Sequence, residues 1–368
     1  MKIELLVDGA GFWPRLAEDL ADARRQILVQ ALTFEADAAG EGLARALLDS
    51  HAGDRRLVID EFTHHVISDK YVYHPKHAFD RGLRTEVRRT RETVAELRAA
   101  GVGVRFTNPA GWFYARMPLR NHKKLVAIDG RVVYVGGINF SDHNFAWHDL
   151  MLRIEDQGVA RFLAEDFDWT WRGVHQATAR RFEGLDFHVL GGRRNEQQLA
   201  LVLDCLAAAQ RRIFIESPYL APPFSEVVRR ASRRGVEVVV VTPEHNNWKL
   251  CHDHIRWKAA TSSMELRLYP QRMTHMKAML IDDRQLVLGS ANYELWSYRF
   301  QQEYFLLSDD PGLVAQFRQK VELPDLALSR RVEPRIGRLA GRLADFRLEW
   351  LERITLAANG RRWEPSGR

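Results

Sequence analysis

The chain has 368 residues, of which 46% are hydrophobic and 28% are charged, and its formal net charge at pH 7 is +6. This balance excludes an intrinsically disordered chain, and the length predicts two domains of ordinary size. The excess of Lys and Arg favours phosphate-bearing partners, so anionic lipid and nucleic acid are both candidates.

Neither the cysteines nor the hydropathy indicate a secreted or membrane-spanning protein. Cys205 and Cys251 are too few for a disulfide framework and match no metal-ligand spacing, which predicts a reducing compartment and no structural metal. The first residues lack the apolar core of a signal peptide, and no segment approaches 18 uninterrupted apolar residues. We therefore expect a cytoplasmic protein that is attached peripherally, if at all, to the inner face of the cell membrane.

An internal repeat divides the chain. Residues 23–30, a helix end followed by an apolar strand, are matched by residues 209–216 at an offset of 186 residues. Each half alternates helical and strand-like segments; in the second half, for example, residues 225–234 are helical and residues 236–241 form an apolar strand. This alternation predicts α/β layers, with helices that cover a central sheet in each half.

In chain order, we expect a first domain over residues 1–185, a second over residues 186–325 and a C-terminal amphipathic helix or tail over residues 326–368. The first domain is longer because of an insertion near residues 62–100, which includes a helix over residues 83–100. The histidines of this insertion match no standard metal site, so we expect no metal there: His64, His65, His74 and His77.

The pattern His-x-Lys-x-x-x-x-Asp occurs twice. The two copies are His122, Lys124 and Asp129, and His275, Lys277 and Asp282. Side chains two residues apart in a strand share a face, so each His and its Lys point the same way. Each Asp lies where a hairpin turn is expected. Each hairpin is followed by small residues and then by an asparagine, which is Asn139 in the first copy and Asn292 in the second. A lone His on a strand is usually structural, but this repetition at identical spacing indicates a duplicated half of an active site.

These residues resemble the HKD motifs of the phospholipase D superfamily, and the resemblance covers most of residues 1–310. Four segments, residues 120–130, 136–142, 217–222 and 234–238, resemble bacterial cardiolipin synthases in particular. The resemblance implies two homologous phospholipase D-like α/β/α halves with pseudo-twofold symmetry and one active site between them. It also implies catalysis without a metal or another cofactor.

A phosphodiester has to be attacked at phosphorus while its leaving alkoxide is protonated, and one imidazole cannot do both in one step. By resemblance, His122 is the nucleophile that forms a phosphohistidine, and His275 is the general acid that later acts as a base. The near-symmetry of the halves leaves the reverse assignment open. Four side chains would donate to the phosphate oxygens: Lys124, Lys277, Asn139 and Asn292. Although Asp129 and Asp282 belong to the catalytic motif, we expect them to brace the hairpins.

Each catalytic imidazole also needs an acceptor for its second ring nitrogen. Glu303 lies eleven residues after the second asparagine, where the family usually places this carboxylate. The same spacing in the first half leads to Leu150, and Asp149 lies one residue earlier. We expect Glu303 to orient His275 and Asp149 to orient His122, with a purely structural role of Asp149 as the alternative.

Two segments bear on the substrate. The loop of residues 108–120 packs on the core or forms a lip at the mouth of the site, where these side chains would meet lipid: Trp112, Phe113, Met117, Arg116 and Arg120. Residues 334–358 have apolar side chains at helical spacing and arginines on other faces. This basic amphipathic helix docks its apolar stripe on the catalytic core or lies on an anionic membrane.

The sequence thus predicts a phosphatidyltransferase acting on anionic glycerophospholipids, most concretely one that makes cardiolipin and glycerol from two phosphatidylglycerol molecules. A phospholipase D that transfers the phosphatidyl group to water is one alternative, because the acceptor enters after the covalent step. A superfamily nuclease is the other; the synthase-like flanks disfavour it. We expect a monomer, because both motifs lie in one chain, and no obligate nucleic-acid partner.

Overall fold

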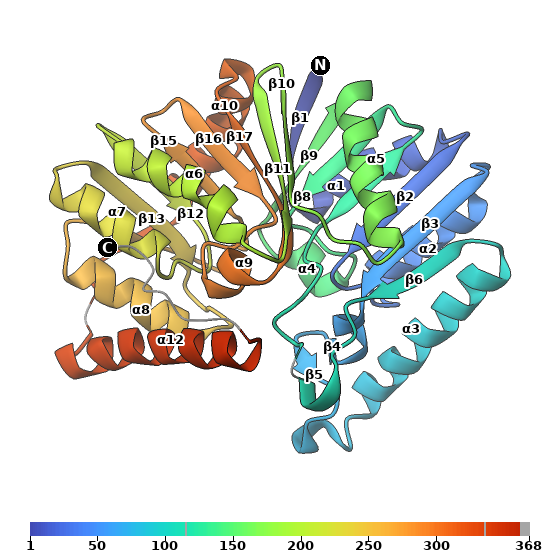
Figure 1. Cartoon of the computed structure of the whole chain (residues 1–368), viewed down its shortest axis with the longest axis horizontal. Helices are drawn as coiled ribbons and strands as arrows, with labels where there is room; N and C mark the ends of the chain where they lie inside the picture. Colours follow the sequence, from blue (N-terminus) through green and yellow to red (C-terminus); the bar gives the residue numbers. More distant parts are fainter. Residues whose placement is uncertain (115, 335, 361–368) are drawn as a thin grey trace. The chain divides into compact units, whose positions relative to one another are not determined.

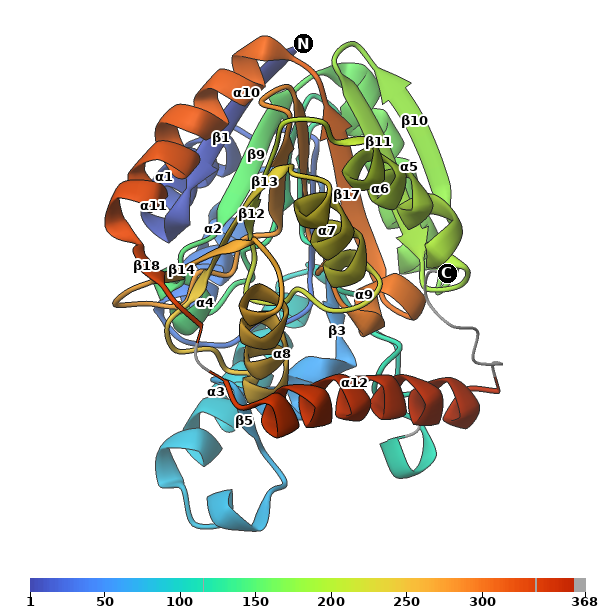
Figure 2. The ribbon, with the colours of Figure 1, turned by 90° about the vertical axis from the view of Figure 1, so that its left-hand side faces the viewer.

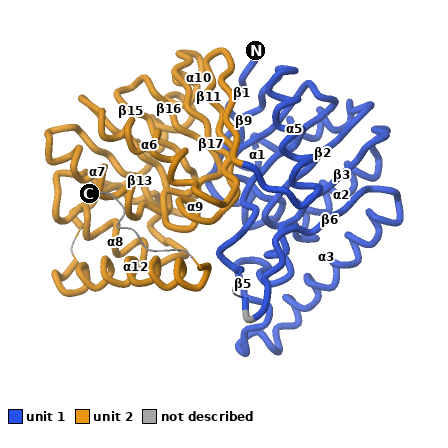
Figure 3. Tube along the Cα trace, in the orientation of Figure 1, with its two compact units in different colours: residues 1–176 blue, residues 177–368 orange. Residues whose placement is uncertain are grey.

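The computed structural model describes residues 1–114, 116–334 and 336–360, and the chain forms two compact units, Met1–Gln176 (unit 1) and Ala177–Arg368 (unit 2) (Figure 3). Unit 1 ends at Gln176, whereas we expected a boundary at residue 185. The boundary precedes strands β10 and β11 because both belong to the sheet of unit 2. The C-terminal helix also belongs to unit 2.

In the described part of unit 1, seven strands form one mixed sheet with the order β1-β9-β8-β7-β2-β3-β6 (Figure 1). The strands of this sheet are β1 (Lys2–Val7), β2 (Gln26–Ala31), β3 (Asp54–Asp60), β6 (Gly103–Thr107), β7 (Leu125–Ile128), β8 (Val132–Gly136) and β9 (Leu150–Glu155). The helices are α1 (Asp8–Ala21), α2 (Ala38–Asp49), α3 (Arg81–Ala99), α4 (Asp142–Ala146) and α5 (Gln157–Trp171). Strands β2, β3 and β6 are parallel to one another, with β6 at one edge of the sheet, and β7 is antiparallel to β2.

Helices cover both faces of this sheet, because consecutive side chains of a strand point to opposite faces. Ile27 and Val29 of β2 belong to a core that also contains Leu16 of α1, Leu43 of α2 and Leu97 of α3. Helix α5 packs against β2, β7, β8 and β9. Unit 1 therefore has the expected α/β/α layers.

In the described part of unit 2, nine strands form a sheet with the order β10-β11-β17-β16-β15-β12-β13-β14-β18. They are β10 (Thr178–Phe182), β11 (Leu185–Gly191), β12 (Arg212–Glu216), β13 (Glu237–Pro243), β14 (Glu265–Tyr269), β15 (Ala278–Ile281), β16 (Gln285–Gly289), β17 (Gln302–Ser308) and β18 (Arg330–Val332). The helices are α6 (Asn195–Ala208), α7 (Phe224–Arg233), α8 (Lys249–Ala260), α9 (Leu295–Arg299), α10 (Pro311–Phe317), α11 (Leu323–Leu328) and α12 (Arg338–Ala358). Helices α6, α7 and α8 share one core with Ile213 and Ile215 of β12. Phe214, the residue between these two isoleucines, points to the opposite face of the sheet and contacts Phe317 of α10.

The two sheets have the same topology. Seven strands of unit 2, in the order β11-β17-β16-β15-β12-β13-β14, correspond one by one to the sheet of unit 1. Even the isolated bridges agree, because Phe34 pairs with Phe140 in unit 1 and Leu220 pairs with Tyr293 in unit 2. The predicted fold class, two homologous α/β/α halves with a C-terminal helix, is confirmed.

The insertion of unit 1 lies between β3 and β6. It contains the short turns η1 (Glu61–His64) and η2 (Pro75–His77), the hairpin of β4 (Val66–Ile67) and β5 (Lys70–Tyr71), and helix α3. The side chain of Asp80 caps α3 by accepting a hydrogen bond from the backbone of Leu83. The corresponding connection of unit 2, between β13 and β14, contains helix α8.

No helix among the described residues combines the length and the apolar character that crossing a membrane requires.

Candidate active site

In unit 1, the His-x-Lys pair directly precedes the central strand β7. His122 and Lys124 are both buried, and Lys124 Nζ donates a 2.7 Å hydrogen bond to the carbonyl oxygen of His122. Lys123, between them, forms a buried ion pair with Asp166 of α5 at 2.7 Å. Lys123 thus serves the packing of α5, and its neighbours His122 and Lys124 are left for the site.

In unit 2, His275 and Lys277 take the equivalent place before β15, and both are buried. Lys277 Nζ lies 2.7 Å from Nδ1 and 3.0 Å from Nε2 of His275, and it also donates to the carbonyl oxygen of His275. Met276, which takes the place of Lys123, is fully buried. Both units therefore hold one ammonium beside one imidazole-bearing residue.

The motif aspartates lie at the hairpin turns. Asp129 accepts hydrogen bonds from the backbone N–H groups of residues 24–26, and Asp282 does the same with residues 210–212. Burial opposes the ionisation of these carboxyls, but the N–H groups outweigh it and hold the pKa of both below the usual range. Each carboxylate thereby ties its hairpin to the start of the neighbouring strand, β2 in unit 1 and β12 in unit 2.

The asparagines that follow the hairpins are also buried. Asn139 Oδ1 accepts a hydrogen bond from the backbone of Leu32 at 3.1 Å, and its amide nitrogen lies 3.3 Å from Asn144 Oδ1. The backbone N–H of Asn292 donates to Ser297 Oγ at 3.0 Å, and Asn292 Oδ1 has no hydrogen-bond partner within the described residues. The side chain of Asn292 is therefore the less restrained of the two.

Strand register identifies the carboxylate that is equivalent to Glu303. In unit 2, Phe305 of β17 pairs with the glycine that ends β16; in unit 1, Met151 of β9 pairs with the glycine that ends β8. Glu303 and Asp149 lie two residues before these partners. The connection is one residue shorter in unit 1, which is why sequence spacing alone leads to Leu150.

The two equivalent carboxylates have different surroundings. Glu303 is fully buried and accepts hydrogen bonds from the hydroxyls of Ser290 and Ser297. Asp149 is also buried, and its oxygens lie 2.2 Å from the place that a Cβ of residue 137 would take. Gly137, the counterpart of Ser290, therefore leaves the space that Asp149 fills.

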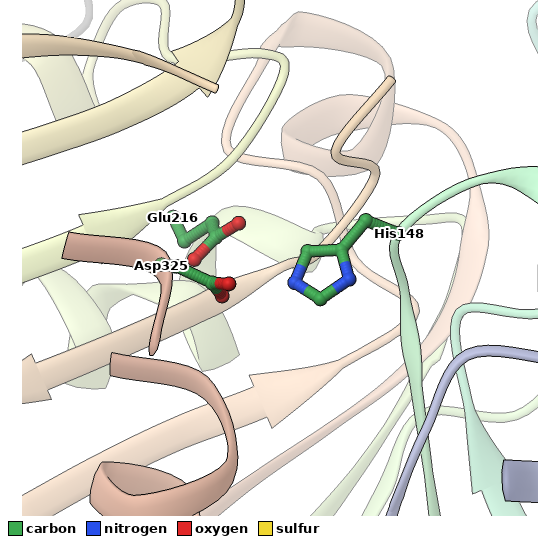
Figure 4. A group of neighbouring side chains, drawn as sticks. All are labelled: His148, Glu216 and Asp325. Carbon is green, nitrogen blue, oxygen red and sulfur yellow. The ribbon is translucent and has the colours of Figure 1, made fainter. Parts of the chain in front are cut away.

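The residue before each motif histidine is hydrogen-bonded to a side chain near the end of β2 in unit 1 or of β12 in unit 2. Gln30 Nε2 donates to Asn121 Oδ1 at 2.9 Å in unit 1, and Thr274 Oγ1 donates to Glu216 Oε1 at 2.5 Å in unit 2. Glu216 is fully buried, and it offers an oxygen within 4.8 Å of one from Asp325 of α11 (Figure 4). Unit 2 thus has two close carboxylates at a strand end where unit 1 has an amide pair.

Known proteins resemble this chain in sequence. The family model described as "Cardiolipin synthase, PLD-like domain" matches residues 16–171 and 202–323, which is more than half of the chain. The chain belongs to this phospholipase D-like family. It is 26% identical to cardiolipin synthase A of Pseudomonas entomophila (87% of this chain, 68% of that protein) and 25% identical to cardiolipin synthase B of Salmonella typhi (84% and 76%).

A solved structure supports the same fold for this member of the phospholipase D superfamily. Phosphatidylserine synthase of Haemophilus influenzae matches 97% of this chain and 94% of its own, with a TM-score of 0.69 and 15% identity. At that identity, the likeness concerns the fold.

The loop before the first motif only partly matches the expected lip. Trp112 is 87% exposed, Arg116 is exposed and Met117 is half-buried, while the side chain of Phe113 lies outside the described part of the chain. Arg120 departs from the expectation, because it is 2% exposed and pairs with the fully buried Asp60 at 2.8 Å. Its guanidinium neutralises a carboxylate inside the unit and is not available to a headgroup.

Sequence reasoning missed two features. Two supports of the carboxylates, Gly137 and Ser290, could have been suspected from the small-residue turn after each hairpin, whereas Ser297 lies in α9. The acidic group of Glu35, Asp37 and Glu86 in unit 1 has oxygens within 4.8 Å of one another and no signal in the sequence. Burial raises the pKa of Glu35 to about 9 and that of Asp37 to about 6, so Glu35 is protonated at neutral pH.

Proposed function

We propose that the chain is a phosphatidyltransferase that converts two phosphatidylglycerol molecules into cardiolipin and glycerol. One observation carries the proposal: each unit has a buried His–Lys pair, with a buried carboxylate at the equivalent place of the sheet. The cardiolipin synthases among the relatives support the choice of reaction.

The first step forms a phosphohistidine. The imidazole of His122 attacks phosphorus, the bond from phosphorus to the glycerol oxygen breaks, and His275 gives its proton to that oxygen, so that glycerol leaves. Lys124 and Lys277 stabilise the negative charge on the non-bridging oxygens as the transition state forms.

The second step transfers the phosphatidyl group. His275, now neutral, removes a proton from a hydroxyl of the second phosphatidylglycerol, and this oxygen attacks phosphorus and displaces His122. The reaction needs one imidazole from each unit at the same phosphorus. Asp149 and Glu303 would position the two imidazoles by holding the second ring nitrogens.

The test is a lipid assay with pure protein and phosphatidylglycerol vesicles. We expect cardiolipin and glycerol, and a loss of at least about 1000-fold in His122→Ala and in His275→Ala. Matched controls are His51→Ala in unit 1 and His245→Ala in unit 2, which remove exposed imidazoles and should leave turnover unchanged. Phosphatidic acid in place of cardiolipin would assign the hydrolase, and the absence of both products would refute a lipid substrate.

Two further measurements sharpen the result. Labelled phosphohistidine should be trapped in His275→Ala and not in His122→Ala; the opposite pattern would exchange the two roles. Cleavage of single-stranded DNA that depends on His122, without lipid turnover, would assign the nuclease.

A further inference from the structure

Helix α12 exposes its apolar side. Five large apolar side chains of the helix are exposed, three of them by more than half: Leu339, Leu343, Phe346, Trp350 and Ile354 (the apolar stripe). At 3.6 residues per turn, these positions lie on one face of a helix about 30 Å long. The stripe is therefore a continuous apolar surface and not a set of scattered side chains.

The opposite face of α12 attaches the helix to unit 2. Figures 1 and 2 show α12 against α8, and Gly341 lies so close to Trp257 of α8 that a Cβ would be 2.2 Å from the indole. Leu348 joins the core of the unit. The buried positions lie about 180° from the stripe around the helix axis. The helix is thus anchored, and packing against the catalytic core does not account for its apolar stripe.

Two acidic side chains of α12 form ion pairs with unit 2 and so do not contribute negative charge to the exposed face of the helix. Asp345 binds His254 at 2.7 Å and Lys258 at 2.8 Å. Glu352 binds Arg299 of α9 at 3.2 Å. Two of the three carboxylates of α12 are therefore neutralised against unit 2.

The charges left on the outer side are mostly positive. The helix, all of which is described, has four exposed arginines, Arg338, Arg342, Arg347 and Arg353, and one exposed carboxylate, Glu349. The helical spacing places Arg342 and Arg353, which pairs with Glu349 at 2.6 Å, on one side of the apolar stripe and Arg347 on the other. Arginines that flank an apolar stripe can reach anionic headgroups while the stripe enters the acyl region.

We propose that α12 is an in-plane membrane-docking helix whose apolar stripe enters the surface of an anionic phospholipid bilayer. Charge complementarity selects this occupant, because two copies of the same face would bring their arginine rows together, whereas anionic headgroups neutralise them. The inference goes beyond the proposed function, because it concerns residues of α12 that belong to neither motif and is tested by binding without turnover.

The experiment measures co-sedimentation of the full chain with vesicles of phosphatidylglycerol and phosphatidylcholine, and with vesicles of phosphatidylcholine alone. The triple variant Leu339→Ser/Phe346→Ser/Trp350→Ser should bind the anionic vesicles about 100-fold more weakly than the wild type. The matched control is Leu201→Ser/Leu323→Ser/Leu328→Ser, which removes exposed apolar side chains elsewhere in unit 2 and should bind like the wild type.

A charge variant tests the arginines. Arg342→Glu/Arg347→Glu should reduce binding to anionic vesicles about 100-fold and leave binding to phosphatidylcholine vesicles nearly unchanged. Quenching of tryptophan fluorescence by brominated lipid should also be smaller in Trp350→Phe than in the wild type, because Trp350 would lie within the bilayer.

Three outcomes would overturn the inference: equal binding of the stripe variant and the wild type, equal loss in the matched control, or a lipid-free dimer that the stripe variant dissociates. The last outcome would assign the face to a second copy. Turnover separates this inference from the proposed function. The stripe variant should keep wild-type activity on a water-soluble short-chain phosphatidylglycerol and lose at least about tenfold on vesicles. A wild type that binds vesicles through the apolar stripe but turns over neither substrate would refute the proposed function alone.

Discussion

Units 1 and 2 share a strand order and a hairpin, but they hold the equivalent carboxylate by opposite means. In unit 2, Ser290 and Ser297 donate hydroxyl groups to Glu303. In unit 1, Gly137 supplies no side chain, and Asp149 fills the space. Backbone pairing sets the place of the carboxylate in both units, so the supports are free to differ. Strand register, and not residue spacing, therefore defines the equivalent positions of this repeat.

A second difference lies beside the motif. Unit 1 buries the ion pair of Asp60 and Arg120, whereas the motif offset and the strand register place Pro243 and Met273 at these positions in unit 2. The duplicated fold therefore tolerates either a buried ion pair or two apolar side chains. Breaking one half of the pair tests whether unit 1 depends on it.

Arg120→Met places in unit 1 the methionine that unit 2 has at the equivalent position, Met273, but it leaves the carboxylate of Asp60 buried without its ion partner. We therefore expect the free energy of unfolding to fall by about 3 kcal/mol at pH 8. Burial raises the pKa of Asp60 to about 6 against the opposing effect of Arg120, and loss of Arg120 raises it further. Because a protonated carboxyl needs no ion partner, the loss should shrink towards pH 5. Urea unfolding at both pH values measures this. Met273→Leu, the control, should cost less than about 1.5 kcal/mol, and a loss independent of pH would contradict the prediction.

Gly137→Ala should lower kcat/KM for phosphatidylglycerol about 100-fold. The new Cβ would displace Asp149, which we propose positions the imidazole of His122. Ser290→Ala, the matched change in unit 2, removes one hydrogen bond to Glu303 without a clash and should cost about tenfold. Lipid turnover measures both, with circular dichroism to check folding. Equal losses of kcat/KM in the two variants would contradict the prediction that the site depends more on the space left by Gly137 than on the hydrogen bond from Ser290.

Asp149→Asn and Glu303→Gln should each slow turnover about tenfold, and each should move a different limb of the pH–rate profile. Loss of a nearby negative charge lowers the pKa of an imidazolium. Asp149→Asn should therefore move the acid limb to lower pH, because the nucleophile His122 must be neutral. Glu303→Gln should move the alkaline limb to lower pH, because His275 must be protonated. Exchanged limbs would reverse the two roles, and unmoved limbs would leave both carboxylates structural.

Glu35→Gln tests a third difference, because unit 2 has Ala221 at the place of Glu35. Burial raises the pKa of Glu35 to about 9, so the native state holds a proton that the unfolded chain releases near pH 4.5. Wild-type stability should therefore fall from pH 4.5 to pH 9, and the variant should lack this component. We expect Glu35→Gln to gain at least about 1 kcal/mol relative to the wild type between pH 5 and pH 9. Parallel pH curves in urea unfolding would show that Glu35 is ionised in the native protein.

Local patterns in the sequence determined the duplicated α/β fold, the two His–Lys pairs and the helical character of the C-terminal segment. Repeats, strand alternation and helical spacing are properties of neighbouring residues, and they need no knowledge of distant contacts. For this reason the predicted halves, and the motif hairpins in each, match the strands β7–β8 and β15–β16.

Only the tertiary structure decided which carboxylate matches Glu303, where Arg120 points and which face of α12 is exposed. The equivalence of Asp149 depends on hydrogen bonds between strands, and the partner of Arg120 lies 60 residues away in the chain. Helical periodicity shows that α12 has two different faces, but packing selects between them. A Cβ at position 341 would clash with Trp257, and Asp345 pairs with Lys258, so the helix attaches through Gly341 and Asp345 and its apolar stripe remains outside.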